Sequence, residues 1–329
     1  MHLPEHLPLA HLPTPIQAMP RLSDALGVEV LVKRDDLTGS HLSGNKVRKL
    51  EFLLARAAHE GATHVVTCGG VQSNHCRATA LAAAPLGMKP VLLLRTPHGR
   101  PDELPEPPTG NVLLDRLAGA TLHLCDPAGY RERTRRMAEL ARAITAEGGR
   151  PFVIPEGGSD ALGALGYVRC AAEIAEQLPD ALPSSVVVAT GSGGTVAGLA
   201  LGFRALELPV RTVGVAVCDD EATFMGIAAD IAAEARTRYG LQAPADEGLR
   251  IVDGFQGRGY ALSTPDELAL LRDTARLDGL VLDPVYTLKA FRALLSLAPS
   301  GALGPRVLFV HTGGIFGLFA ASDALAPLL

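Results

Sequence analysis

The sequence predicts an α/β protein built around parallel β-sheet. Short β-branched runs alternate over most of the 329 residues with Ala- and Leu-rich stretches whose apolar residues recur at helical spacing. Such alternation is typical of strand–helix–strand units, which form parallel sheets. With 47% hydrophobic residues, the chain is long enough to bury a sizeable core in one large or two medium domains.

Eight runs carry the predicted strands, and the intervals between them carry the predicted amphipathic helices. The strand runs are VEVLVK (28–33), THVVTC (63–68), PVLLLR (90–95), ATLHLC (120–125), PFVIP (151–155), SVVVAT (185–190), VRTVGVAV (210–217) and RVLFVH (306–311). A proline-rich stretch at 95–111 predicts a surface loop. Because ligand sites of open parallel sheets lie at the carboxyl ends of the strands, function is expected in the loops that follow them.

The composition argues against several classes of function. The net charge is −5 and the basic residues are scattered, so nucleic acid is not an expected partner. The proline-interrupted N-terminus lacks a signal-peptide pattern, and no apolar run approaches the roughly 18 residues of a membrane span, so we expect a cytoplasmic protein without a membrane partner. Five cysteines without a C-x-x-C pair predict neither a disulfide framework nor a metal site.

Lys46, in the stretch SGNKVRKLE (43–51), breaks two local rules. On a helix with Ser43 as its N-cap, Lys46 falls in the first turn, where the helix dipole disfavours a cation by roughly 0.3–1 kcal/mol. It also falls at the centre of an apolar stripe, which is formed by Leu50, Leu53, Leu54 and Ala57. The alternative, a lysine that lays its stem on apolar surface and keeps its amine in water, is left open by this stretch alone.

The loop after the second predicted strand, TCGGVQSNHCR (67–77), is suited to holding a carboxylate. It leaves the strand through two glycines and then offers Ser73, Asn74 and His75 at the start of a helix. A plain N-cap without any ligand explains the same residues, and this stretch does not decide between the two interpretations.

The loop after the sixth predicted strand is suited to holding a phosphate. Gly191, Ser192, Gly193, Gly194 and Thr195 would expose several N–H groups and two hydroxyls to an anion. The dinucleotide fingerprint needs glycine at its sixth position, where Val196 stands, and the Gly-Lys-Ser/Thr of nucleotide triphosphatases is absent. A single monoester phosphate therefore fits best.

An inward-facing amine and a cradle for one phosphate together indicate pyridoxal 5′-phosphate. This cofactor needs an amine for its Schiff base, a phosphate site and a partner for its pyridine nitrogen. Lys46 is the best candidate among the five lysines of the chain. Thr312 follows the last predicted strand, and Tyr286 and Thr287 follow Pro284, but either stretch is also compatible with ordinary core and turn chemistry.

Several ordered motifs resemble those of the D-cysteine desulfhydrase and 1-aminocyclopropane-1-carboxylate deaminase family, over nearly the whole chain. The motifs are KRDDLTGSHLSGNKVRKLE (33–51), GGVQSNHCR (69–77), IPEGGSDALGALGYV (154–168), GSGGTVAGLALG (191–202), LDPVY (282–286) and FVHTGG (309–314). The resemblance implies a homodimeric pyridoxal-phosphate enzyme of fold type II, with two open parallel-sheet α/β domains and the active site between them. A large cofactor-binding domain would comprise residues 1–48 and 155–329, and a small domain residues 49–154.

The resemblance also implies roles for individual residues. The catalytic residues would be Lys46, Ser73, Tyr260 and Tyr286. The cofactor-binding residues would be Lys46, Asn45, Asn74, Gly191, Ser192, Gly193, Gly194, Thr195, Thr287 and Thr312. The substrate-binding residues would be Ser73, Asn74, His75 and Arg258. In these roles Lys46 forms the Schiff base and shuttles protons, Asn74 contacts the ring hydroxyl, and the two tyrosines flank the substrate.

The residue after Tyr286 bears on which reaction the resemblance favours. The deaminases carry a glutamate there, which keeps the pyridine nitrogen protonated, whereas Thr287 stands here, as in the desulfhydrases. A hydroxyl makes the cofactor a weaker electron sink, which suffices to expel a thiolate but suits the opening of a cyclopropane ring less well. Thr312, where the deaminases tend to have leucine, points the same way. The expected reaction is α,β-elimination from D-cysteine to pyruvate, ammonia and hydrogen sulfide.

Two departures from the family pattern leave the substrate open. Leu288 stands where glycine is usual, and Arg258 occupies the loop before Tyr260, where a neutral residue is usual. An Arg258 that faces the pocket would suit the sulfonate of an L-cysteate sulfo-lyase substrate, whereas a solvated loop arginine is the structural alternative. Deaminase activity on 1-aminocyclopropane-1-carboxylate, a nicotinamide dehydrogenase built on the 191–195 loop and a non-catalytic carrier of pyridoxal phosphate are the remaining alternatives.

Overall fold

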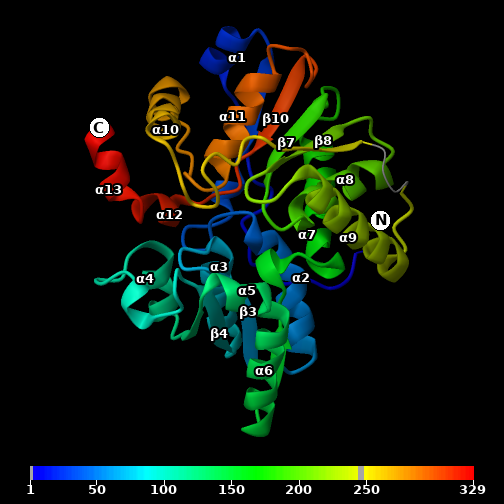
Figure 1. Cartoon of the computed structure of the whole chain (residues 1–329). Helices are drawn as coiled ribbons and strands as arrows, with labels where there is room; N and C mark the ends of the chain where they lie inside the picture. The colour runs from blue at the N-terminus through cyan, green and yellow to red at the C-terminus, as the bar shows by residue number, and fades with distance from the viewer. Residues whose placement is uncertain (1–2, 244–247) are drawn as a thin grey trace.

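The computed structural model describes residues 3–243 and 248–329, whose strands form two sheets (Figure 1). The six-stranded sheet has the order β1-β2-β10-β7-β8-β9, and the four-stranded sheet has the order β5-β4-β3-β6. Within both sheets the paired strands are parallel, apart from the antiparallel pair β1 and β2. The prediction of an α/β protein with two open parallel sheets is therefore confirmed.

The strands and helices alternate along most of the chain. The strands are β1 (Ile16–Ala18), β2 (Glu29–Lys33), β3 (His64–Gly70), β4 (Lys89–Arg95), β5 (Thr121–Cys125), β6 (Pro151–Val153), β7 (Ser185–Thr190), β8 (Arg211–Ala216), β9 (Leu249–Val252) and β10 (Arg306–Val310). The helices are α1 (Pro20–Leu26), α2 (Lys46–His59), α3 (Asn74–Ala83), α4 (Gly110–Leu117), α5 (Pro127–Arg131), α6 (Arg133–Ala146), α7 (Ala161–Gln177), α8 (Gly194–Ala205), α9 (Glu221–Tyr239), α10 (Pro265–Asp278), α11 (Thr287–Leu297), α12 (Ile315–Phe319) and α13 (Ser322–Leu325).

All eight predicted strands are present, and two further strands, β1 and β9, were not predicted. Both are edge strands of the six-stranded sheet, with the sequences IQA and LRIV. Segments this short show neither an alternating nor a sustained apolar pattern, so pairing with the neighbouring strand alone defines them. The stretch at 95–111, predicted as a loop, begins with the last residue of β4 and ends inside α4.

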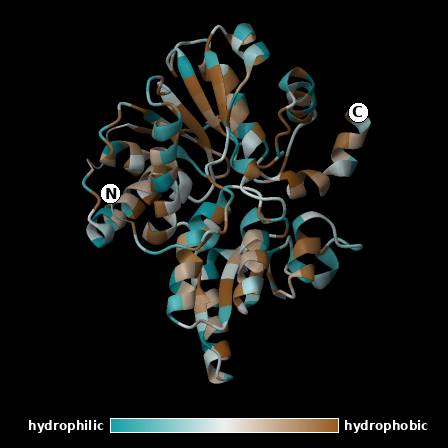
Figure 2. Cartoon of the chain, turned by 180° about the vertical axis from the view of Figure 1, so that it is seen from behind, coloured by the Kyte–Doolittle hydropathy of each residue, from teal (hydrophilic) through white to brown (hydrophobic). Residues whose placement is uncertain are grey.

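Helices α2, α7 and α8 pack closely beside the six-stranded sheet. A Cβ atom at Gly166 of α7 would lie 2.3 Å from the carbonyl oxygen of Arg48 on α2. A Cβ atom at Gly198 of α8 would lie 2.3 Å from the carbonyl oxygen of Ala164 on α7. Glycine at these two positions lets the helix backbones touch. Figure 2 shows apolar strands inside this arrangement and polar residues on many outer helix surfaces.

The predicted domain boundaries at 48/49 and 154/155 remain a prediction. The strands of the four-stranded sheet lie between His64 and Val153, and those of the six-stranded sheet lie on both sides of that segment. The first boundary falls inside α2, so one helix would run from the first domain into the second. Residues 1 and 2 of the predicted large domain lie outside the described residues.

None of the helices within residues 3–243 and 248–329 combines the length and the apolar character that crossing a lipid bilayer requires.

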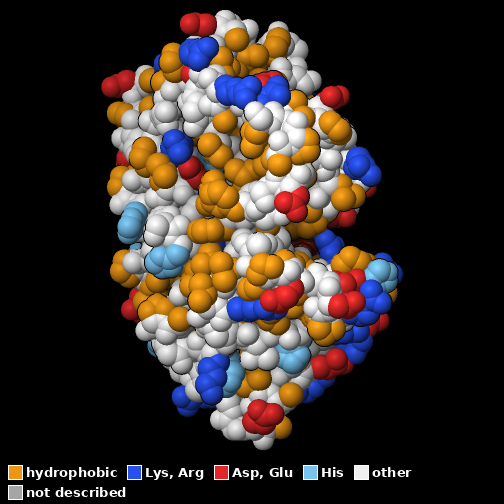
Figure 3. Space-filling view, turned by 90° about the vertical axis from the view of Figure 1, so that its left-hand side faces the viewer, with side chains coloured by type: hydrophobic (Ala, Val, Ile, Leu, Met, Phe, Trp, Pro, Cys, Tyr) orange, Lys and Arg blue, Asp and Glu red, His pale blue; other side chains and the backbone are white. Residues whose placement is uncertain are grey.

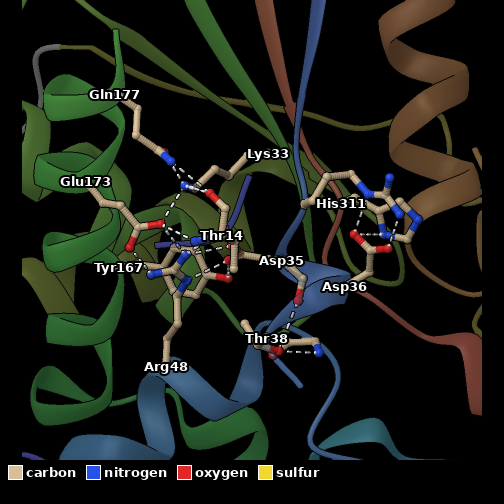
Figure 4. Close-up of polar contacts among 12 residues, drawn as sticks. Thr14, Lys33, Asp35, Asp36, Thr38, Arg48, Tyr167, Glu173, Gln177 and His311 are labelled. Atoms are coloured by element: carbon tan, nitrogen blue, oxygen red, sulfur yellow. Dashed lines mark hydrogen bonds and ion pairs between the residues drawn. The ribbon is translucent and has the colours of Figure 1, made fainter. Parts of the chain in front are cut away.

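A buried cluster of charges joins α2 to the six-stranded sheet and to α7 (Figure 4). The Arg48 guanidinium donates to both carboxylate oxygens of Asp35, at 2.8 Å each, and to Glu173 Oε2 at 2.8 Å. Lys33 Nζ donates to Glu173 Oε1 at 2.5 Å, and the Tyr167 hydroxyl donates to Asp35 Oδ2 at 2.5 Å. Burial alone would raise the pKa of Asp35, but Arg48 holds that pKa below its usual value. The cluster is therefore charged and internally compensated.

Replacing Glu173 with alanine should lower the free energy of unfolding by about 3–5 kcal/mol, because Lys33 and Arg48 would lose a shared counter-charge in the interior. Unfolding in urea measures the change. The matched control is Glu234→Ala, which removes an exposed partner of Arg238 and should cost no more than about 1 kcal/mol. Equal losses in the two variants would contradict a stabilising role for the buried cluster.

Candidate active site

A cavity of about 350 Å³ lies where the carboxyl ends of the two sheets face each other. The loops after β3, β7 and β10 and the start of α2 contribute much of its lining. The structure brings together most of the predicted site residues in this lining. They are Asn45, Lys46, Ser73, Asn74, His75, Gly191, Ser192, Gly193, Thr195, Tyr260, Tyr286 and Thr312.

Lys46 is the first residue of α2, and its half-buried side chain lines the cavity. Its Nζ donates to Asn45 Oδ1 at 3.0 Å and lies 5.9 Å from the centre of the Tyr286 ring. Loss of solvent lowers the pKa of Lys46 to about 8; Asp283 opposes this lowering and Arg77 adds to it. An amine with this pKa is about one-tenth neutral at pH 7, far more than an ordinary lysine, and only the neutral form acts as a nucleophile or base.

The N-cap predicted for α2 was wrong, whereas the apolar stripe was right. Asn45 is the N-cap residue, and Ser43 Oγ instead donates to the carbonyl oxygen of Asp36 at 2.7 Å. The stripe residues Leu50, Leu53, Leu54 and Ala57 are buried together in one core cluster. The face of α2 that carries Lys46 therefore points inward.

Gly44 brings the Lys46 loop against the end of β10. Its φ is +110°, and a Cβ atom there would lie 2.9 Å from the carbonyl oxygen of Thr312. The same carbonyl oxygen accepts a hydrogen bond from the Asn45 N–H at 3.1 Å. This contact places the Thr312 side chain on the cavity wall near Lys46.

The loop 191–193 between β7 and α8 has the geometry of a cradle that could hold an anion. No side chain from the N-cap residue Gly193 caps α8, which leaves N–H groups of its first turn available to an anion. Gly193 has a φ of +82°, and a Cβ atom there would lie 2.5 Å from a side chain of α9. The hydroxyl-bearing residues Ser192 and Thr195 line the same part of the cavity.

Lys49 lies behind this cradle, although it was not predicted as a site residue. Its Nζ donates to the carbonyl oxygen of Gly157 at 3.1 Å and to Ser159 Oγ at 3.0 Å. Ser159 Oγ in turn accepts from the Gly194 N–H at 3.2 Å and lies 2.8 Å from Ser192 Oγ. Gly194, which was predicted to bind the cofactor, does not line the cavity, and Ser159 accepts its N–H. The available sequence signal was the three-residue spacing from Lys46, which puts both amines on one face of α2.

The loop after β3 presents Ser73 and Asn74 at the start of α3. Ser73 Oγ accepts from the Cys76 N–H at 3.2 Å, so the N-cap interpretation is correct for this residue, which also lines the cavity. Asn74 Oδ1 accepts from Asn111 Nδ2 at 3.0 Å. Because the Asn74 oxygen already accepts this hydrogen bond, it is the NH₂ group of Asn74 that can donate to a ligand in the cavity.

His75 lines the cavity as a neutral ring. Its Nε2 lies 2.8 Å from Thr67 Oγ1. Burial, followed by the charges of Lys46 and Lys49, lowers the pKa of His75 well below its ordinary value. A neutral imidazole adds no positive charge beside the two lysines.

Tyr260 and Tyr286 form a hydrogen-bonded pair on the cavity wall. Their hydroxyl oxygens lie 2.6 Å apart, and their rings meet edge to face with centroids 5.8 Å apart. Burial raises the pKa of Tyr260 to about 12 and that of Tyr286 well above its ordinary value. Both hydroxyls are therefore protonated at neutral pH, and a pair of two hydroxyls retains one O–H to donate to a ligand.

Thr287 and Arg258, which were predicted to face the cofactor and substrate, lie outside the cavity lining. Thr287 is fully buried, and its hydroxyl donates to Asp283 Oδ1 at 2.7 Å, so this hydrogen bond within the turn uses the hydroxyl proton. Arg258 is exposed on the loop before Tyr260, in line with the solvated alternative. Leu288 is fully buried in the core around the six-stranded sheet and does not line the cavity either.

A charged group on the four-stranded-sheet side of the cavity was also not predicted. Arg95 lines the cavity, with its guanidinium carbon 5.0 Å from the Tyr130 ring centre and 5.1 Å from the Tyr260 ring centre. The Tyr130 hydroxyl donates to Glu156 Oε1 at 2.6 Å, and Arg133 Nε pairs with Glu156 Oε2 at 2.9 Å. Arg95 is the last residue of β4, and ligand sites of parallel sheets lie at such strand ends. No glycine loop follows β4 directly, so nothing further in the sequence selected Arg95.

Comparison with known proteins places this cavity in a family. The sequence model of the family described as "Pyridoxal-phosphate dependent enzyme" matches residues 7–313. The chain belongs to this family.

Relatives of the chain within this family resemble it over nearly its whole length. A D-cysteine desulfhydrase of Klebsiella pneumoniae is 44% identical, with 95% of each chain covered. A mitochondrial bifunctional D-cysteine desulfhydrase/1-aminocyclopropane-1-carboxylate deaminase of Arabidopsis thaliana is 42% identical, over 99% of this chain and 82% of that protein. The crystal structure of an ACC deaminase homologue superposes with a TM-score of 0.90 at 40% identity, covering 99% of this chain and 96% of the other.

The residues of the cavity fit the cofactor of this family. Lys46, with its amine of lowered pKa, and the start of α8 line one cavity, and a second buried lysine, Lys49, lies behind the loop before α8. Lys46 could hold the aldehyde carbon, and Ser192, Thr195 and the first turn of α8 could hold the phosphate, with Lys49 behind them. Membership of a pyridoxal-phosphate family also excludes the nicotinamide dehydrogenase alternative.

The lowered pKa of Lys46 should appear in the pH dependence of cofactor capture by cofactor-free protein. Only the neutral amine attacks the aldehyde, so the rate constant should rise about tenfold per pH unit below pH 8 and level off above it. Stopped-flow absorbance measures the rate, with free Nα-acetyl-lysine as the unshifted reference. A rate that keeps rising up to pH 10, as for the free amine, would contradict the lowered pKa.

Proposed function

We propose that the chain is a lyase that eliminates the sulfur substituent of D-cysteine to give pyruvate, ammonia and hydrogen sulfide. The observation that carries this proposal is one cavity in which the Lys46 amine lies beside the Tyr260–Tyr286 pair and Thr312 offers a hydroxyl in place of a carboxylate. Relatives named D-cysteine desulfhydrase, at 44% identity over most of both chains, support it.

Each part of pyridoxal phosphate would meet a specific group of residues. Asn45, hydrogen-bonded to Lys46 Nζ, holds the amine at the cofactor's aldehyde end. The NH₂ group of Asn74 would donate to the ring hydroxyl, since Asn74 Oδ1 already accepts from Asn111. Thr312 is the polar residue available to the pyridine nitrogen, because Thr287 is bound to Asp283.

Pyridoxal phosphate, when bound, withdraws electrons from the Cα atom of an amino acid, which acidifies the Cα proton and lets a β-substituent leave. Lys46, with its pKa of about 8, is the base that takes this proton. The Tyr260–Tyr286 pair donates its remaining O–H to the departing sulfur. Ser73 and the N-terminus of α3 receive the substrate carboxylate, beside the neutral His75.

A hydroxyl partner for the pyridine nitrogen favours sulfur elimination over ring opening. Thr312 does not stabilise a protonated ring nitrogen as a carboxylate would, so the electron sink is moderate. A thiolate leaves readily and needs no stronger sink. The Asp283 carboxylate accepts the N–H groups of Val285 and Tyr286 at 2.9 and 3.0 Å, which keeps it within its own turn.

We further propose that the protein acts in the cytoplasm as a homodimer. Five free cysteines, four of them buried, suit a reducing compartment. Figure 3 shows apolar side chains on the face that carries α4, α12 and α13, and the exposed ones include Leu113, Leu117, Phe319 and Leu329. A second copy would cover these side chains. Light scattering after size exclusion measures the oligomeric state.

Purified protein should carry a visible absorption band and release pyruvate and sulfide from D-cysteine. Lys46→Ala should abolish the band and lower turnover by about 10²–10⁴-fold, because the base and the cofactor attachment are lost together. The matched control is Lys89→Ala, which removes an exposed lysine at the start of β4 and should leave both unchanged.

The substrate assignment is tested by pyruvate release from D-cysteine, D-serine and 1-aminocyclopropane-1-carboxylate side by side. D-Cysteine should be turned over fastest. Preferred turnover of the cyclopropane would contradict the desulfhydrase assignment. A protein that binds the cofactor but releases pyruvate from no β-substituted amino acid would be a carrier, and the proposed function would be wrong.

A further inference from the structure

Arg95 lines the cavity without an anionic partner. It is the last residue of β4 and is paired in register with Gly70, where the loop that carries Ser73 begins. Its half-buried guanidinium lies against the rings of Tyr130 and Tyr260. Within the described part of the chain, no carboxylate forms an ion pair with it. An Arg that is ordered by two rings but uncompensated is prepared to bind an anion.

The acidic residues of the cavity do not neutralise Arg95. Both carboxylate oxygens of Glu156 are occupied, one by Arg133 and the other by the Tyr130 hydroxyl. Asp219 belongs to the loop after β8 of the opposite sheet and is exposed to solvent. An anion that enters from the four-stranded-sheet side therefore meets an unbalanced positive charge.

A continuous line of contacts connects Arg95 to the base. Lys46 Nζ lies 5.9 Å from the Tyr286 ring centre, and the Tyr286 and Tyr260 hydroxyl oxygens are 2.6 Å apart. The Tyr260 ring centre is 5.1 Å from the Arg95 guanidinium carbon. A substrate with its Cα atom near Lys46 and its β-substituent beside the tyrosines would direct that substituent toward Arg95.

From these contacts we infer that Arg95 binds an oxyanion on the β-carbon of the substrate, so that the enzyme also accepts β-sulfonated amino acids. This inference rests on the proposed lyase function and extends its substrate class. A guanidinium presents coplanar N–H groups that match two oxygens of such a group, whereas a thiol offers no oxygen. Arg95, and not the exposed Arg258, is therefore the specificity residue for an anionic leaving group.

The reaction of the sulfonate needs no oxidant or reductant. Lys46 takes the Cα proton, the Cα–Cβ double bond forms, and the Cβ–S bond breaks with its electron pair leaving on sulfur as sulfite. The released enamine tautomerises and hydrolyses with one water to pyruvate and ammonium. Cysteate and water therefore give pyruvate, ammonium and hydrogen sulfite. Arg95 would stabilise the charge that accumulates on the departing group.

The test compares the wild-type holoenzyme with Arg95→Met, Arg95→Lys and the control Arg100→Met, which alters an exposed arginine in the loop after β4. Both enantiomers of cysteate and of cysteine serve as substrates, and pyruvate, sulfite and sulfide are measured. Arg95→Met should lower kcat/KM for the β-oxyanion substrates about 10- to 100-fold, mainly through KM, and change that for cysteine less than about threefold. For Arg95→Lys, kcat/KM for cysteate should lie between the values of the wild type and Arg95→Met, and for Arg100→Met it should equal that of the wild type.

Binding is measured separately, by the change in the cofactor's visible spectrum on adding cysteate. A loss of cysteate affinity in Arg95→Met supports the inference even if no pyruvate is released, in which case only the proposed function fails. Wild-type enzyme that turns over D-cysteine but neither binds nor cleaves cysteate would overturn the inference and leave the proposed function standing. Equal losses for cysteine and cysteate in Arg95→Met would also overturn it, since Arg95 would then only support Tyr260.

Discussion

The buried charge cluster around Arg48 fixes the helix on which the candidate active site depends. Arg48 stands two residues after Lys46 on α2 and is held by Asp35 after β2 and by Glu173 on α7. Buried charges tolerate little displacement, because an ion that loses its partner in the interior is costly. The start of α2 is therefore tied to the six-stranded sheet and to α7 at once. The Lys46 amine enters the cavity from a fixed helix end.

Around that helix end, the structure concentrates positive potential while lowering the pKa of the reactive amine. Lys46 and Lys49 lie on one face of α2, and the N-termini of α3 and α8 adjoin the same cavity. Burial, together with the charge of Lys46, lowers the pKa of Lys49, while burial brings that of Lys46 to about 8. Helix N–H groups attract an anion without titrating. The site can thus hold a phosphate and still offer a neutral amine.

The two ends of the cavity differ in the polar groups that they present. Toward β10, Thr312 supplies a hydroxyl. The Asp283 carboxylate is not available there, because it accepts hydrogen bonds from the N–H and the hydroxyl of Thr287 in its own turn. Toward β4, the aromatic rings of Tyr130 and Tyr260 hold the Arg95 guanidinium. In the proposed function, the first end would set how strongly the cofactor withdraws electrons, and the second end would set which leaving group the site accepts. Reaction type and substrate choice would then depend on different loops.

The sequence by itself determined the α/β class and the eight main strands, and it pointed to Lys46 and to the 191–195 loop, most of which lines the cavity, because runs of apolar residues and glycine loops are local patterns. Only the tertiary structure decided that Arg95 lines the cavity, that Lys49 lies behind the 191–193 loop and that Thr287 lies outside the lining. Lys49 reaches the cradle through Ser159, and Arg95 reaches Tyr260, across more than a hundred residues of sequence in each case. Such meetings depend on how distant strands align in two sheets, which no local pattern encodes.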